Sequence, residues 1–203
     1  MNLASALLIF LLTVSASADV FKKAPLEPNS DFYVEVLPLH LQFRYEDTTQ
    51  QTRATRTYQG ILNFALQYNQ YRATYAQALH SDISTSGNVS VEQNISEQLI
   101  SLGYGFFKVS SVPRAVSLNL EFFGNGYIGS TETSVDTKLF GNTTKSKGTP
   151  EMVFGLGASA VGRAFVKNFF AVSEIDLKLL YSNNMNPQTV PALGFRLGLG
   201  YRF

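Results

Sequence analysis

The carboxyl-terminal segment 193–203 alternates between apolar and non-apolar residues without a break. Because successive side chains of a β-strand point to opposite faces, one face of this segment is wholly apolar, and the other carries only glycine and arginine. The sequence stops on Phe203, so no later segment covers the apolar face. A strand in water gains little from such an ending, whereas a strand facing lipid does. The segment therefore predicts a transmembrane β-barrel, with Leu193, Phe195, Leu197, Leu199, Tyr201 and Phe203 on its apolar face.

The amino terminus has the pattern of an export signal. An apolar run over 6–14 is too short to span a bilayer, and it leads into the small residues Ala16-Ser17-Ala18. We therefore expect residues 1–18 to be a signal peptide and residues 19–31 to be a periplasmic lead-in. The alternative is a hydrophobic strand or an anchor helix. Beyond residue 18, no stretch approaches the roughly 20 apolar residues that a spanning helix needs.

Composition excludes several classes of function. Charged residues make up 15% of the chain, below the roughly 25% of typical soluble domains. The net charge is +1, which gives no basic footprint for nucleic acid. The chain has no cysteine, so disulfides, thiolate metal sites and cysteine nucleophiles are absent. With only two histidines, far apart in the chain, no metal or other cofactor is expected.

Segments of period-two alternation, bounded by turn residues, predict eight strands of a length suited to a tilted membrane strand. Short connections at 69–70, 108–114 and 165–168 alternate with longer polar loops at 46–56, 81–94, 128–151 and 182–191. Short turns on one side and long loops on the other are typical of outer-membrane barrels, with both termini on the periplasmic side. The predicted strands are 33–45, 57–68, 71–80, 95–107, 115–127, 152–164, 169–181 and 192–203.

The alternation by itself does not say which face lies outside, because a soluble lipocalin-like barrel reverses the arrangement. The apolar faces are bulky (Leu37, Leu39, Leu41 and Phe43 are one example), while the opposite faces are rich in glycine and serine. A narrow lumen favours small residues, and a water-facing exterior would carry many lysines and glutamates. The bulky faces are therefore expected to contact lipid. Aromatic girdles are expected from Phe32, Tyr33, Tyr68, Tyr71, Phe106, Phe107, Phe169, Phe170, Tyr201 and Phe203 on the periplasmic side, and from Tyr45, Tyr58, Tyr127, Phe154, Tyr181 and Phe195 on the outer side.

On these features the chain resembles the small bacterial outer-membrane β-barrels of the eight-stranded OmpA/OmpX type. The resemblance covers residues 32–203 as a pattern, and it implies an all-β, antiparallel, up-and-down transmembrane barrel in the bacterial outer membrane. It also implies insertion by the barrel assembly machinery, for which Leu197, Leu199, Tyr201 and Phe203 resemble the carboxyl-terminal signal. Outer-membrane lipids and lipopolysaccharide are the expected surroundings. The chain departs from many relatives in having no tryptophan.

If the bulky faces contact lipid, a set of charged side chains points into the lumen and must be paired there. A hairpin symmetric about residue 186 sets Asp176 opposite Arg196, with Glu174 and Lys178 in the same network. Glu121 is expected to join through Arg163 or a water. The predicted network is Arg44, Glu121, Arg163, Glu174, Asp176, Lys178 and Arg196, among the inward polar residues His40, Gln42, Asn63, Gln67, Asn119 and Arg202. A structural plug is the favoured interpretation, because eight-stranded interiors are filled by side chains, and a narrow ion path is the alternative.

Two classes of function remain open. The first is a structural or surface-interaction role through the external loops, whose lysines Lys138, Lys145 and Lys147 are either solvated or directed to lipopolysaccharide phosphates. The second is a rim enzyme acting on lipid or peptide, for which the triplet His80-Ser81-Asp82 is the candidate. Adjacent residues of a strand point to opposite faces, so this triplet cannot form a catalytic triad by itself. A secreted soluble barrel is a weaker third option.

Overall fold

The computed structural model of the chain describes residues 21–23, 31–47, 53–87, 89–111, 116–140, 142–182 and 189–203. The expected signal peptide and most of the expected lead-in lie outside these ranges. All regular structure in the described residues is β, and they include no helix able to cross a membrane. The strands are β1 (Phe21–Lys23), β2 (Phe32–Asp47), β3 (Arg53–Tyr68), β4 (Tyr71–Ser86), β5 (Val89–Ser111), β6 (Ser117–Leu139), β7 (Asn142–Lys147), β8 (Glu151–Val166), β9 (Phe169–Tyr181) and β10 (Thr189–Arg202).

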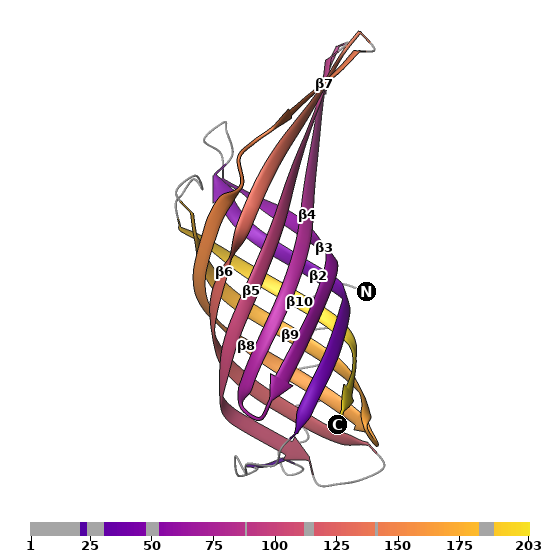
Figure 1. The fold of residues 1–203 in the computed structure, drawn as a ribbon, viewed down its shortest axis with the longest axis vertical. Coiled ribbons are helices and arrows are strands. Elements are labelled where there is room, and N and C mark those ends of the chain that lie inside the picture. Colours follow the sequence, from indigo (N-terminus) through magenta and orange to yellow (C-terminus); the bar gives the residue numbers. More distant parts are fainter. Residues whose placement is uncertain are drawn as a thin grey trace.

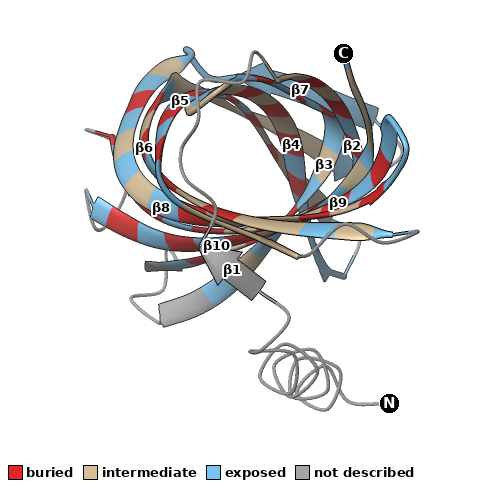
Figure 2. Ribbon diagram, turned by 90° about the horizontal axis from the view of Figure 1, so that it is seen from below, coloured by how far each residue is buried: buried red, intermediate tan, exposed pale blue. Residues whose placement is uncertain are grey.

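Eight of these strands close into a barrel (Figure 1). The order β5-β4-β3-β2-β10-β9-β8-β6 returns to β5 through a long β5–β6 ladder, and every pairing is antiparallel. Seen from below, the strands form a ring (Figure 2). Where β10 meets β2, the Phe203 backbone N–H donates to the Phe32 carbonyl at 3.0 Å. The predicted eight-stranded antiparallel barrel is therefore confirmed. Strand β1 lies outside the ring, on β5, and β7 lies outside it on β6.

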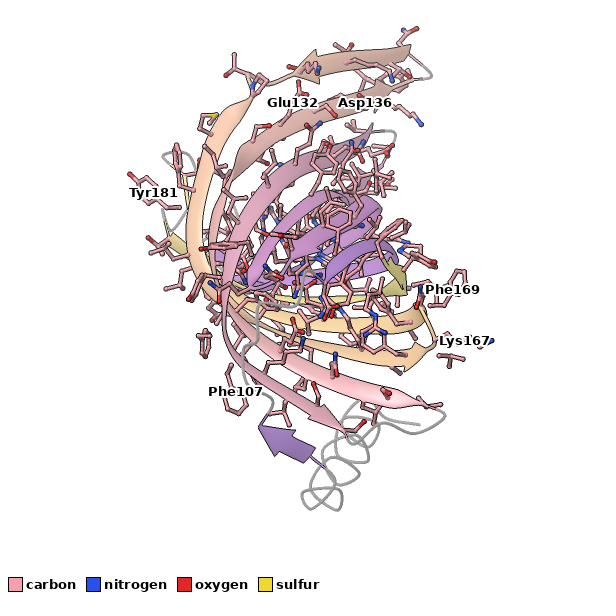
Figure 3. All side chains as sticks on the ribbon, turned by 60° about the horizontal axis from the view of Figure 1, so that its bottom comes forward. Phe107, Glu132, Asp136, Lys167, Phe169 and Tyr181 are labelled. Atoms are coloured by element: carbon pink, nitrogen blue, oxygen red, sulfur yellow. The ribbon has the colours of Figure 1, made fainter. Side chains whose placement is uncertain are left out.

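The apolar faces point outward and the polar faces point inward. Leu102 and Leu156 are 68% and 73% exposed, whereas Glu35 and Gln42 are fully buried inside the barrel. The labelled rings of Phe107, Phe169 and Tyr181 stand on the outside of the wall in Figure 3. This is the arrangement of a barrel in lipid, and it is the reverse of a soluble lipocalin-like barrel.

Two of the predicted external loops are strands instead. Strand β4 continues to Ser86 and β5 begins at Val89, so 81–94 is a tight hairpin, and within 128–151 most residues belong to β6 and β7. These segments are rich in threonine, serine and valine, and the β-branched residues among them suit a pleated surface. They form a four-stranded sheet beyond the barrel, in the order β4-β5-β6-β7 (Figure 1). We call it the projecting sheet; it comprises 81–86, 89–96, 132–139 and 142–147.

An extra residue in β2 changes which of its side chains face the lumen. Leu197 pairs with Leu39 but Leu199 pairs with Val36, so β2 bulges at Leu37–Pro38. Proline has no N–H to give to a ladder, and it is tolerated at such bulges. The prediction that Leu37 faces lipid is wrong, because Leu37 is fully buried in the lumen. The bulge likewise turns Glu35 inward.

Four aromatic residues assigned to the girdles lie inside the barrel: Tyr33, Tyr58, Tyr127 and Phe170. The β2 bulge accounts for Tyr33, and a second bulge between Gly60 and Leu62 in β3 accounts for Tyr58. Tyr127 and Phe170 follow the inward alternation of their own strands. The girdles on the outside are thus smaller than predicted.

Candidate functional site

The lumen contains a balanced set of buried charges. Among the described residues, ten charged side chains are buried, of which five are acidic and five are basic. Burying a lone charge costs several kcal/mol even after relaxation. Equal numbers of acidic and basic side chains allow the buried charges of the lumen to neutralise one another. The acids are Glu35, Glu97, Glu121, Glu174 and Asp176, and the bases are Arg44, Arg72, Arg163, Lys178 and Arg196.

Most of these charges form one continuous chain of ion pairs. Arg72 lies at its centre, with its guanidinium 2.7 Å from Glu35 and 2.9 Å from Glu174. Each carboxylate meets a second arginine, and the alternation of sign leaves no like charges in direct contact along the chain. The sequence of contacts is Arg163–Glu35 (2.7 Å), Glu35–Arg72, Arg72–Glu174, Glu174–Arg196 (2.8 Å), Arg196–Asp176 (3.1 Å) and Asp176–Lys178 (3.1 Å).

The structure brings Asp176 and Arg196 together, but not as direct cross-strand partners. Arg196 stands opposite Glu174, and Gly194 stands opposite Asp176. The pairing of Thr189 with Tyr181 centres the hairpin on residue 185 rather than 186, which shifts the register by two residues. Arg196 therefore reaches Asp176 diagonally. A Cβ at position 194 would overlap the Asp176 carboxylate, so glycine leaves the space that the carboxylate needs.

The other predicted members lie at the two ends of the lumen. Glu121 joins the chain directly through Arg163 at 3.1 Å, and it also meets Lys108 at 3.2 Å. Arg44 pairs with Glu97, and its guanidinium lies 4.3 Å from the centre of the Tyr58 ring. Asn119 and Arg202 are only half-buried.

Sequence reasoning missed Glu35, Arg72 and Glu97. Arg72 and Glu97 lie on the inward faces of β4 and β5, so the alternation of those strands was a sufficient signal. The alternation of β2 gave no sign of Glu35 in the lumen, because an unbroken alternation through β2 places this residue on the lipid side.

Packed side chains fill the lumen on both sides of the ion chain. Toward the end that holds both the start of β2 and the end of β10, Arg163 lies 4.8 Å from the centre of the Tyr33 ring, within an apolar cluster. Toward the projecting sheet, Leu99, Tyr127 and Val153 belong to a second cluster. The first cluster is Tyr33, Leu37, Ala65, Phe123, Val161, Phe165, Phe170 and Val172. The described lumen is therefore a plug of polar and aromatic side chains.

The candidate triplet at the rim, His80-Ser81-Asp82, does not form a catalytic triad; its histidine instead contacts a backbone carbonyl and the aspartate. His80 Nδ1 lies 2.8 Å from the Thr57 carbonyl oxygen, and His80 Nε2 lies 2.9 Å from Asp82 Oδ2. Ser81 points to the opposite face, as the alternation requires, so it is not aligned with His80. The His80 ring lies 5.2 Å from the Tyr58 ring. Among the described residues no group of three histidine, aspartate or glutamate side chains is placed to hold a metal ion.

The projecting sheet has two unlike faces. Its outer face carries Glu132 and Asp136, labelled in Figure 3, and these acids pair with Lys147 at 2.7 Å and Lys145 at 3.0 Å. Its inner face, which continues the lumen side of the wall, is uncharged above Asp82. That inner face carries Ser84, Ser86, Val89, Val91, Gln93, Thr133, Val135, Thr137, Leu139, Asn142, Thr144 and Ser146.

Solved structures of other proteins share this architecture, although no sequence match was found. No family model and no curated protein matches the sequence. Among solved structures, neisserial surface protein A matches with a TM-score of 0.51 at 16% identity, over 85% of this chain and 97% of that one. The attachment invasion locus protein Ail of Yersinia pestis (TM-score 0.43, 16% identity, 86% and 99%) and the amino-terminal barrel of Pseudomonas aeruginosa OprF (0.39, 14%, 86% and 98%) also match. The chain therefore shares the fold of neisserial surface protein A, a small eight-stranded antiparallel β-barrel, and its outward apolar belt suits this barrel to a membrane.

Proposed function

We propose that the protein acts at the cell surface through the projecting sheet, while its barrel serves as a closed membrane anchor. The observation that carries this proposal is the contrast between the two parts. The lumen is filled by paired charges and aromatic clusters, whereas the projecting sheet stands beyond the barrel with strands unpaired on one side. Aqueous channels need about 16 strands or more, so general diffusion through this barrel is not supported.

The unpaired edge of β4 is the part of the projecting sheet best suited to a partner. Strand β4 pairs with β3 only up to Leu79, so among the strands that the structure describes Ser81–Ser86 pairs with β5 on one side and with no strand on the other. An edge strand offers unpaired backbone groups to another chain, and proteins often block such edges with lysine. The opposite edge, β7, carries Lys145 and Lys147, whereas the β4 edge has Ile83, which is 69% exposed. We infer that β4 accepts an extended segment of a partner protein.

A lysine at position 83 tests this edge. In the refolded full chain, Ile83→Lys is expected to abolish binding of a fluorescent, strand-forming peptide of alternating threonine and valine with charged ends, measured by anisotropy. Thr143→Lys places the same charge on the β7 edge and is the control; it should leave binding unchanged. Equal binding by both variants, or no binding by the unmodified chain, would contradict the proposal. Unchanged heat-modifiable gel migration would show that both variants fold.

The carboxyl-terminal residues Leu197, Leu199, Tyr201 and Phe203 are proposed as the segment read by the barrel assembly machinery. Leu199 and Phe203 are about as exposed as the lipid-facing leucines, and the Tyr201 ring packs against Phe169 and Phe203. Phe203→Ser should lower the amount of folded protein in cells while leaving refolding in detergent intact. Equal losses in both measurements would show a role in stability only. The surrounding lipopolysaccharide is likewise a proposed contact, although Lys145 and Lys147 are already paired with acids.

A further inference from the structure

A groove in the lipid-facing wall is not explained by the proposed surface role. It has a volume of about 640 Å³, and it crosses β3, β2, β10, β9 and β8 on the outside of the barrel. These strands form the short side of the barrel, away from the projecting sheet, and the groove lies near their extracellular ends. It is thus placed in the outer half of the membrane.

Two rows of outward side chains run across the strands and bound this groove. One row is Phe43, Leu193, Leu177 and Ala158, which are successive cross-strand partners. The other contains Pro191, Leu179 and Leu156, which are also successive partners. The second row continues to Tyr45 on β2 and Thr55 on β3, which pair with each other. Neighbouring strands lie about 4.8 Å apart, so five strands give a groove about 19 Å long.

The polarity of the groove changes along its length. At the β3 end, Thr55 and Tyr45 supply hydroxyl groups, and Thr55 lies only two residues from the start of its strand. At the β8 end, Leu156 and Ala158 are apolar, and Leu156 lies five residues from the start of its strand. The groove therefore descends from the interface into the hydrocarbon. Arg44 and Lys178 border it from strands whose charged side chains point into the lumen.

We propose that this groove binds one acyl chain of a bilayer lipid, with its polar end at Thr55 and Tyr45 and its methyl end at Ala158. The groove continues the lipid interface already established by the apolar belt. With barrel strands tilted by about 40° from the membrane normal, a 19 Å groove perpendicular to them spans about 12 Å of depth, close to one leaflet of a hydrocarbon core about 30 Å thick. An acyl chain is the component of the membrane with this length and this gradient of polarity.

The absence of tryptophan allows a single reporter to be placed in the groove. Phe43→Trp puts it in the row formed by Phe43, Leu193, Leu177 and Ala158, and Ile100→Trp puts a control on the lipid-facing side of β5. Both proteins would be refolded into vesicles of phosphatidylcholine brominated on its acyl chains and then extracted into a mild, unbrominated detergent. We expect the reporter at position 43 to stay quenched after extraction and the reporter at position 100 to recover fully. Native mass spectrometry should show a single retained lipid.

A blocking substitution makes the test specific. In the Phe43→Trp protein, Ala158→Phe should restore fluorescence and remove the retained lipid. Ala164→Phe, on the same outward face of β8 but below the groove, should change neither. Recovery of the reporter at 43 in the unblocked protein, or retention of lipid despite Ala158→Phe, would overturn the proposal. A dimer by light scattering without retained lipid would also overturn it, because a second copy would then cover the groove.

Discussion

Replacing Arg72 by methionine is expected to lower the free energy of unfolding of the barrel by about 3–5 kcal/mol, the usual cost of removing one partner from a buried ion pair. Arg72 is almost completely buried and bonds to both Glu35 and Glu174. Without it, the lumen holds five buried acids and four buried bases, and two carboxylates each lose a charge-assisted hydrogen bond. Urea unfolding in detergent micelles, followed by circular dichroism, measures the change.

Two further variants show whether the effect comes from the buried charge. Lys145→Met breaks an exposed ion pair with Asp136 and should cost less than about 1 kcal/mol. Adding Glu35→Gln to Arg72→Met restores equal numbers of buried acids and bases. The double variant should therefore be less destabilised than the sum of the two single variants. If the two changes are simply additive, the charge balance of the lumen is not what holds the chain of ion pairs together.

The number of barrel strands, their orientation and the short turns near 69–70 and 165–168 could be predicted because each depends on local alternation. The predicted turn at 108–114 is wrong up to Ser111, which still belongs to β5, and residues 112–114 lie outside the described residues. The pattern of β9, with Ile175, Leu177 and Leu179 outward, is enough to place Glu174, Asp176 and Lys178 in the lumen. Bulges are different, because one extra residue inverts a strand without leaving a mark in the alternation itself. Pro38 was the available signal of the bulge in β2. Because the bulge was not predicted, Leu37 was assigned to the wrong face and Glu35 was left out of the lumen network.

The projecting sheet could not be read from composition alone. Segments 81–94 and 128–151 are polar on their outer face and only moderately apolar on their inner face. A search for strands that have one bulky, lipid-facing apolar face therefore assigns these segments to loops. Their strand structure comes from pairing between residues 89–96 of β5 and residues 132–139 of β6, which lie at the ends of these strands farthest from the connection between them. For the same reason, the partners within the lumen network depended on register. A shift of two residues changed the direct partner of Arg196 from Asp176 to Glu174.

The second large effect is expected at Gly198, where β10 passes the bulge of β2. A Cβ at this position would lie 2.8 Å from Leu37 Cα and closer still to the Val36 carbonyl oxygen, so the obstacle is backbone rather than a movable side chain. Gly198→Ala should therefore force β2 and β10 apart at the seam that closes the barrel. Overpacking of this kind costs about 1–3 kcal/mol, which urea unfolding in micelles would measure.

A matched substitution separates crowding from the general effect of replacing a glycine. Gly124, on the outward face of β6, has no atom within 4 Å of the site of a Cβ. Gly124→Ala should leave stability unchanged or raise it slightly, since glycine in a strand interior is unfavourable relative to alanine by about 0.5–1 kcal/mol. If both substitutions have the same effect, the close approach of β10 to Leu37 does not limit closure. If only Gly198→Ala destabilises, the bulge that carries Glu35 into the lumen also determines which residue β10 can tolerate at the seam.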